Sequence, residues 1–141
     1  MKRITLILLT LFAYFSSFAQ VGIIENFSTT TLPTGWTNAS FANTDVAPCE
    51  GTYAWRKNFW SLGTTGTLTT PNYVGVSNGT DVSVSFQWKA TEYDPGDGVG
   101  FTVNVQFSTN NGTTWQTIGS PISTTSVTEC AAFTATIPAA S

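Results

Sequence analysis

Histidine is absent from this chain of 141 residues, and charged residues make up only 9% of it. The missing imidazoles remove the commonest general base and the commonest zinc ligand, which excludes histidine-based catalysis and most zinc sites. The formal net charge is −3 and the few basic residues form no cluster, so a nucleic-acid partner is not expected. Aromatic residues reach 13%, and a chain this apolar and aromatic is not disordered.

Helical periodicity is also missing, because no segment shows an apolar stripe at a 3.6-residue spacing. Apolar and polar residues instead alternate over residues 82–89 and 99–108, which predicts strands that each bury one row of side chains. Clusters of Gly, Pro, Asn and Asp between the apolar segments predict turns. We therefore expect an all-β fold, an antiparallel β-sandwich. Weaker strand signals occur at Gly22–Phe27, Tyr53–Trp60, Gly66–Pro71, Thr114–Ile118 and Ala131–Ile137.

The first residues are typical of a secretory signal peptide. Lys2 and Arg3 precede an apolar run over residues 4–15, and Ser17 and Ala19 offer small residues at a cleavage site. The run is shorter than the ~20 residues that a membrane-spanning helix needs, and no second run of that length follows. We therefore expect residues 1–19 to be removed and residues 20–141 to be secreted, extracellular or at the cell surface, without membrane insertion.

The two cysteines, Cys49 and Cys130, fit an oxidising compartment. A bridge between them would close a long loop, which the chain-entropy model values at roughly 4–5 kcal/mol. Two free buried thiols are the alternative, because the spacing alone does not establish bonding geometry.

Several short segments resemble the cleaved adhesin or MAM-like jelly-roll domains, which occur in bacterial secreted adhesins and as accessory domains of secreted enzymes. The opening Glu25-Asn-Phe27 and Leu32-Pro-x-Gly35-Trp36 segments carry the resemblance most clearly. The other matching segments are Tyr53–Trp60, Leu68–Pro71, Val82–Trp88 and Val103–Thr109. In that family a further strand, with an Asp before an apolar pair, closes the domain; no match to it occurs here, so we expect residues 20–141 to form a jelly roll whose final strand or strands are missing.

The resemblance implies a non-catalytic adhesion or binding module, with an extracellular glycan or glycoprotein as its partner. The alternative is an accessory domain of a secreted hydrolase, a peptidase or glycoside hydrolase, whose catalytic domain lies downstream.

A structural calcium ion is a further expectation, because Ca²⁺ is bound by oxygen ligands and needs no histidine. The resemblance implies Glu25 as a ligand, together with Asp45. A second possible site uses Asp94 and Asp97, on the density of oxygen atoms in that segment alone.

The segment Glu92-Tyr-Asp94-Pro-Gly-Asp97 also has the outline of the Glu-x-Asp-x-x-Glu site of jelly-roll β-glucanases, where two carboxylates act as nucleophile and acid. Asp97 replaces the acid/base Glu, however, and Pro95-Gly96 would interrupt the strand that aims the carboxylates. A solvated turn is therefore expected here, and the chain is not expected to be an enzyme.

The densest aromatic stretch, residues 53–60, is the candidate carbohydrate platform. Period-two alternation puts Arg56, Asn58 and Trp60 in one row, and an aromatic ring beside cationic and amide groups suits a sugar. The alternative is that these aromatic side chains belong to the core, which is the commoner role of Trp in a sandwich.

The segment Ser108-Thr-Asn110-Asn-Gly112-Thr-Thr114-Trp115 is similar to an Asp-box, the hairpin repeated in sialidase propellers, with Asn110 in place of Asp. Gly112 allows a positive φ, and the Asn side chain can hydrogen-bond the turn backbone while the Trp packs beneath it. One copy predicts a folded hairpin and no propeller.

Overall fold

A computed structural model describes residues 22–59, 65–73 and 79–139, and the predicted signal peptide, residues 1–19, lies outside those ranges. Within them the chain forms short strands and no helix, so no described helix could cross a membrane. The ten strands are β1 (Thr37–Ala39), β2 (Ala42–Thr44), β3 (Ala54–Arg56), β4 (Thr67–Thr69), β5 (Val82–Trp88), β6 (Phe101–Val103), β7 (Gln106–Phe107), β8 (Gln116–Thr117), β9 (Ile122–Thr124) and β10 (Ala131–Ile137).

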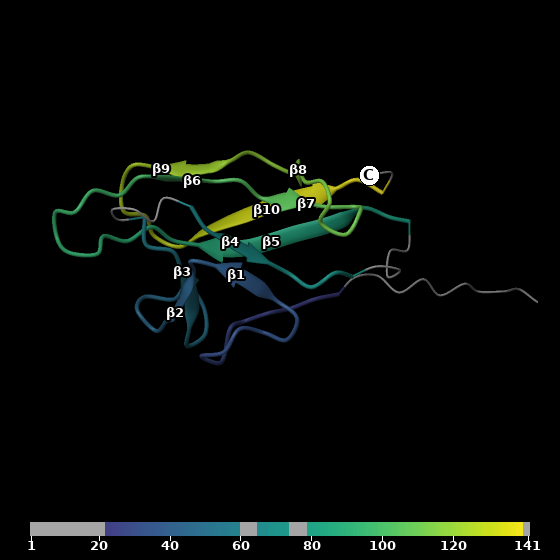
Figure 1. Ribbon diagram of the computed structural model, residues 1–141. Helices are drawn as coiled ribbons and strands as arrows, with labels where there is room; N and C mark the ends of the chain where they lie inside the picture. Colours follow the sequence, from purple (N-terminus) through teal and green to yellow (C-terminus); the bar gives the residue numbers. More distant parts are fainter. Residues whose placement is uncertain (1–21, 60–64, 74–78, 140–141) are drawn as a thin grey trace, which may run out of the picture.

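Each described strand pairs antiparallel with one other, giving the ladders β1–β4, β2–β3, β5–β10, β6–β9 and β7–β8. The prediction of an all-β, antiparallel fold is thereby confirmed. Figure 1 shows the long β5–β10 ladder across the middle of the molecule, with β6–β9 and β7–β8 on one side of it and β1–β4 and β2–β3 on the other.

The β5–β10 ladder is the longest in the described part of the chain. Seven residue pairs join the two strands, and Phe133 lies directly opposite Phe86, with ring centroids 5.0 Å apart. The serine and threonine rows are exposed, while Phe133 is buried. This alternation follows from the period of two along a strand. Phe86 departs from the expected pattern, because 38% of its surface is exposed although it shares the face of Phe133.

The buried face of this ladder packs toward β6–β9 and β7–β8. A Cβ placed on Gly119, between β8 and β9, would lie only 2.9 Å from the Phe133 ring. The Trp88 ring meets Phe101 of β6 edge to face, at 5.9 Å between centroids. The described core therefore sits between these two layers, where Ile118 and Ile122 are also buried.

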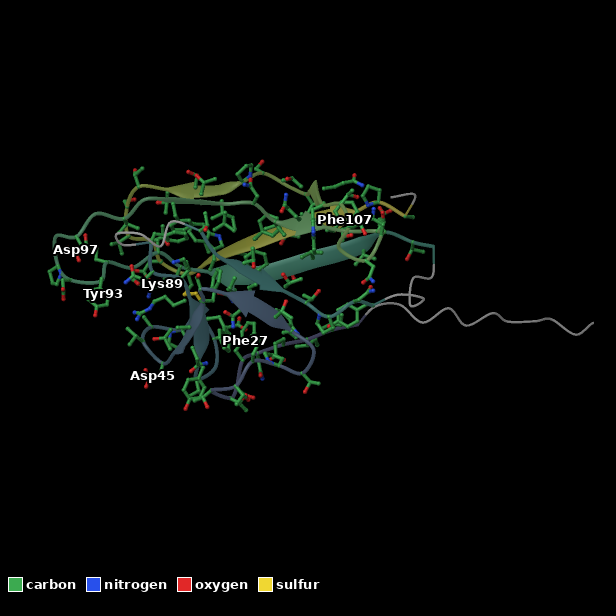
Figure 2. The ribbon with its side chains drawn as sticks, in the orientation of Figure 1. Phe27, Asp45, Lys89, Tyr93, Asp97 and Phe107 are labelled. Carbon is green, nitrogen blue, oxygen red and sulfur yellow. A yellow bond between two sulfur atoms is a disulfide. The ribbon has the colours of Figure 1, made fainter. Side chains whose placement is uncertain are left out.

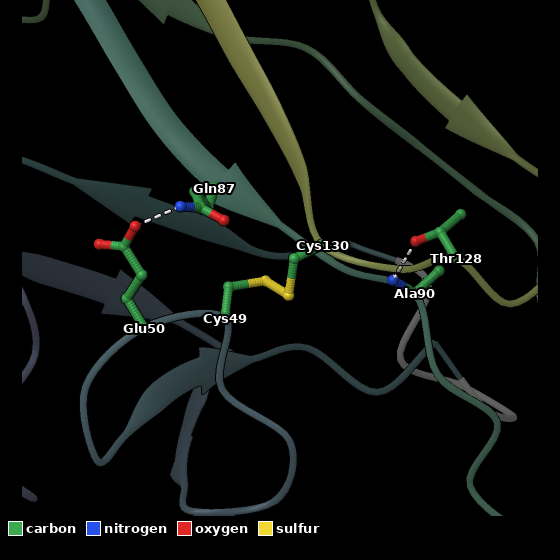
Figure 3. Close-up of a disulfide and its surroundings, with 6 residues drawn as sticks. All are labelled: Cys49, Glu50, Gln87, Ala90, Thr128 and Cys130. Atoms are coloured by element: carbon green, nitrogen blue, oxygen red, sulfur yellow. Dashed lines mark hydrogen bonds between the residues drawn. A yellow bond between two sulfur atoms is a disulfide. The ribbon is translucent and has the colours of Figure 1, made fainter.

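A disulfide links the central ladder to the loop after β2. Cys49 and Cys130 are bonded with their Cα atoms 5.5 Å apart, and Cys130 directly precedes β10. Beside the bridge, the Gln87 amide donates a hydrogen bond to the Glu50 carboxylate (Figure 3). The bridge therefore ties residues separated by 81 positions in the sequence.

Several predicted strand boundaries were wrong. No strand forms over Gly22–Phe27, where Phe27 has a φ of +48° and its backbone N–H binds the Glu25 carboxylate of its own segment. The strand expected over 99–108 is split into β6 and β7, although its alternation of half-buried and exposed residues persists. The other weaker segments yield two or three paired residues each, except Ala131–Ile137, which forms β10 throughout. Three strands that the sequence did not reveal, β1, β2 and β9, lack a run of alternating apolar residues.

Candidate binding site

A pocket of about 400 Å³ opens at one end of the molecule. Asn58, just after β3, lines it together with Tyr93, Asp94 and Asp97 of the loop between β5 and β6. Figure 2 shows Tyr93 and Asp97 on this projecting loop. The fold thus brings together two segments about 35 positions apart, and unites one predicted glycan contact with two predicted calcium ligands.

Packing on both sides of Asn58 fixes its position at the pocket. The Phe59 ring stacks on Phe101 of β6, with the planes 8° apart and the centroids separated by 5.6 Å. The ammonium group of Lys57 donates to the Asn58 carbonyl at 2.6 Å and lies 5.6 Å from the Phe59 centroid, a cation–π distance. The backbone at Asn58 is therefore held between a packed ring and an ion–dipole contact, and its exposed side chain faces the pocket.

Local turn chemistry shapes the opposite wall, residues 92–97, which we call the acidic loop. Asp97 N–H donates to the Asp94 carbonyl at 3.0 Å, with Pro95 and Gly96 at the two central positions. Gly96 has a φ of +95°, as a type II turn requires at its third residue. The solvated turn expected from the sequence is what the structure contains.

Carboxylates of the acidic loop also bind its own backbone. Glu92 accepts from Gly96 N–H, and Asp97 accepts from Asp94 N–H, both at 3.2 Å. No hydrogen bond to the Asp94 carboxylate occurs among the described residues. The Asp94 carboxylate therefore presents its acceptor oxygens to the pocket. The Asp97 carboxylate also lines the pocket but already accepts one hydrogen bond from the turn.

The aromatic member of the pocket is Tyr93, which the sequence analysis did not select. Its side chain is 68% exposed, so the face of the ring is accessible to a ligand in the pocket. The signal was present in the sequence, because Tyr93 stands between two acidic residues in a turn, where no core position could be expected.

The aromatic stretch at residues 53–59 alternates as predicted. Arg56 and Asn58 are exposed, while Tyr53, Trp55 and Phe59 are half-buried. Arg56 does not line this pocket, although its side chain is exposed two residues before Asn58. Trp60 lies outside the described residues.

The predicted calcium ligands are divided between two regions. Glu25 binds the backbone of Phe27 at 2.7 Å, and Asp45 lies on the exposed loop after β2, apart from Tyr93 and Asp97 in Figure 2. Within the described ranges, no three His, Cys, Asp or Glu side chains gather as a metal site would require. Since Ca²⁺ takes six to eight oxygen ligands, Asp94 and Asp97 alone do not make a calcium site. Calcium at either position stays a prediction.

Residues 108–115, which we call the Asn110 turn, form the folded hairpin that the sequence predicted. Asn110 Oδ1 accepts from Thr114 N–H at 2.8 Å, and the Trp115 indole donates to the Gly112 carbonyl at 3.1 Å. Asn111 and Gly112 have φ values of +58° and +78°, the pair of positive angles that a type I′ turn requires. This turn joins β7 to β8 and takes no part in the pocket.

Comparison of the chain with protein-family models, with curated proteins and with solved structures gives no significant match.

Proposed function

We propose that this protein is a non-catalytic binding module that holds an extracellular carbohydrate, free or on a glycoprotein, in the pocket between Asn58 and the acidic loop. The observation that carries the proposal is the pocket itself, which combines an exposed aromatic ring with carboxylate and amide groups. The jelly-roll architecture, the secretion of the chain and its role in adhesion belong to the same proposal, since the sequence resemblance and the signal-peptide pattern support them.

The size and lining of the pocket favour a polar ligand. Its volume of about 400 Å³ falls within the range of roughly 300–1,000 Å³ that is usual for small-molecule sites. Three of its four lining side chains, Asn58, Asp94 and Asp97, carry amide or carboxylate groups. An apolar ligand would take the Asp94 carboxylate out of water without supplying a hydrogen bond to it, which is costly.

A sugar satisfies both kinds of surface at once. Carboxylate oxygens accept hydrogen bonds from hydroxyl groups, and such charge-assisted bonds are stronger than neutral ones. The Asn58 amide can both donate and accept. The Tyr93 ring supplies a flat apolar face for the C–H side of a pyranose. Because the acidic loop is braced by its own hydrogen bonds, binding would cost little ordering of the backbone.

The test is direct binding by the folded protein. We expect a glycan array that covers plant β-glucans, chitin-derived oligosaccharides and mucin-type glycans to reveal binding, and titration calorimetry to give its affinity. Tyr93→Ala should weaken binding to the best array glycan by about tenfold or more, because a stacked ring contributes more than 1 kcal/mol. Asp94→Asn should weaken it by less, since the amide retains one acceptor oxygen.

Trp115→Ala provides the matched control, since Trp115 is also an exposed aromatic residue, at 46%, but lies on the Asn110 turn. It should leave glycan affinity unchanged. If Trp115→Ala abolishes binding while Tyr93→Ala has no effect, the site has been placed at the wrong end of the molecule. The absence of any glycan binding across the array would refute the carbohydrate proposal.

A further inference from the structure

The Asn110 turn contains an asparagine followed by glycine, Asn111-Gly112, and both residues are exposed. This dipeptide is the one most open to deamidation, because glycine has no side chain to shield its backbone nitrogen. In that reaction the Gly112 nitrogen attacks Cγ of Asn111, a new N–Cγ bond forms, and the Cγ–Nδ2 bond breaks to release ammonia. Water then opens the resulting succinimide to aspartate or isoaspartate, so that the net change is uptake of water and loss of ammonia.

Both reacting groups make hydrogen bonds in the structure. Gly112 N–H donates to the Ser108 hydroxyl at 2.8 Å, and that proton must leave before the nitrogen can attack. The Ser108 hydroxyl is itself oriented, because it donates to Asn110 Oδ1 at 3.0 Å. The orientation of the Asn111 side chain is also fixed, since its Oδ1 accepts a hydrogen bond from the Asn72 amide.

We propose that Asn111 is a latent deamidation site and that the Ser108 hydroxyl keeps it slow by holding the Gly112 amide proton. The hydroxyl acts as a positioning group and not as a base, because a serine alcohol takes up no proton at neutral pH. Conversion would be disruptive: isoaspartate inserts an extra methylene into the backbone at the residue whose φ is +58°. The type I′ geometry and the bonds that Asn110 makes across the turn would then be lost.

Three variants of the intact protein test the proposal. Ser108→Ala removes the acceptor, Ser108→Thr retains a hydroxyl, and Thr114→Val removes the acceptor of the Asn110 amide without touching Gly112 N–H. After incubation at mildly alkaline pH, peptide mapping by mass spectrometry would measure conversion of Asn111, and isoaspartyl methyltransferase labelling would identify isoaspartate. Asn78-Gly79, the other Asn-Gly pair in the chain, serves as the reference in the same digest.

We expect Ser108→Ala to accelerate conversion of Asn111 by about three- to tenfold, the effect of losing one hydrogen bond. Ser108→Thr and Thr114→Val should match the unmodified chain, and Asn78 should react at one rate in all four proteins. An unchanged rate in Ser108→Ala overturns the proposal, and so does equal acceleration by Thr114→Val, which would show that general loosening of the turn is responsible. If Ser108→Ala does not fold, amide hydrogen exchange of the unmodified protein decides: Gly112 N–H should be protected, and free exchange overturns the proposal.

Discussion

The Asn110 turn and the acidic loop are two turns of similar composition, both short and rich in Asn or Asp and Gly, yet they use their polar groups differently. In the Asn110 turn the side chains of Ser108, Asn110 and Thr114 bond one another and the backbone between them. In the acidic loop only Glu92 and Asp97 bind the backbone, and Tyr93 and Asp94 remain directed to the pocket. A turn therefore becomes a candidate site where it has more polar groups than its own backbone hydrogen bonds require.

The polar side chains of the Asn110 turn therefore stabilise the turn itself. The acidic loop, in addition, carries polar groups that its own turn does not use. Substitutions should therefore separate the two, with stability responding at the first and binding at the second. Three changes probe this contrast.

Removing the disulfide should affect both turns alike, because it destabilises the whole fold. In the double variant Cys49→Ser, Cys130→Ser we expect the free energy of unfolding to fall by roughly 4–5 kcal/mol, since the closed loop is long. Urea denaturation of the oxidised protein and the variant, followed by tryptophan fluorescence, would measure this. Reduction of the unmodified protein is the control and should give the same midpoint; a change below about 1 kcal/mol would show that the bridge constrains little.

Asn110→Ala should lower stability without affecting binding. The side chain accepts from Ser108 and from Thr114 N–H and donates to Thr114 Oγ1. At about 1 kcal/mol for each net hydrogen bond, the free energy of unfolding should fall by roughly 2–3 kcal/mol. Glycan affinity measured under folding conditions should stay as it was. Asn110→Asp, which keeps the acceptor oxygens, is the conservative comparison and should cost less; a loss of glycan affinity in Asn110→Ala would contradict the separation of the two turns.

Replacing the central glycine of each turn gives the finest comparison. Gly112 and Gly96 both have positive φ, and an alanine in that region costs about 1–2 kcal/mol. A Cβ on Gly112 would lie 3.5 Å from the Trp115 ring, whereas one on Gly96 would meet nothing within 4 Å. The two variants should therefore lose similar stability in thermal unfolding, but only Gly96→Ala should weaken glycan binding, by distorting the pocket wall. Equal affinities for the two variants would show that the acidic loop does not shape the site.

Local sequence patterns predicted the elements whose geometry depends on near neighbours. Alternation placed β5 and β10 correctly because a strand of seven residues with one buried face leaves a clear period of two. The Asn110 turn was predictable for the same reason, since the hydrogen bonds that close it join residues at most four positions apart. The short strands β1 and β2 were not, because threonine, asparagine and alanine carry no such period and only pairing with β4 and β3 defines them.

The candidate site was predicted in its parts but not in its grouping. Asn58, Asp94 and Asp97 were selected from composition and alternation, each for a different ligand. Their meeting depends on Phe59 stacking on Phe101, which brings the segment after β3 to the base of the acidic loop. Tyr93 was missed because the aromatic candidates were sought in the dense stretch at residues 53–60, although its acidic neighbours in a turn already indicated an exposed ring.

The sequence alone determined that this chain is all-β, that its long strands bury one row of side chains, and that residues 108–115 close on themselves, because each of these follows from contacts within a few residues. The tertiary structure decided that Cys49 meets Cys130, that Phe133 packs over Gly119, and that Asn58 shares a pocket with Tyr93. Those contacts join residues from 14 to 81 positions apart. Which partners meet at such separations depends on how the layers pack, and no local spacing of residues encodes that choice.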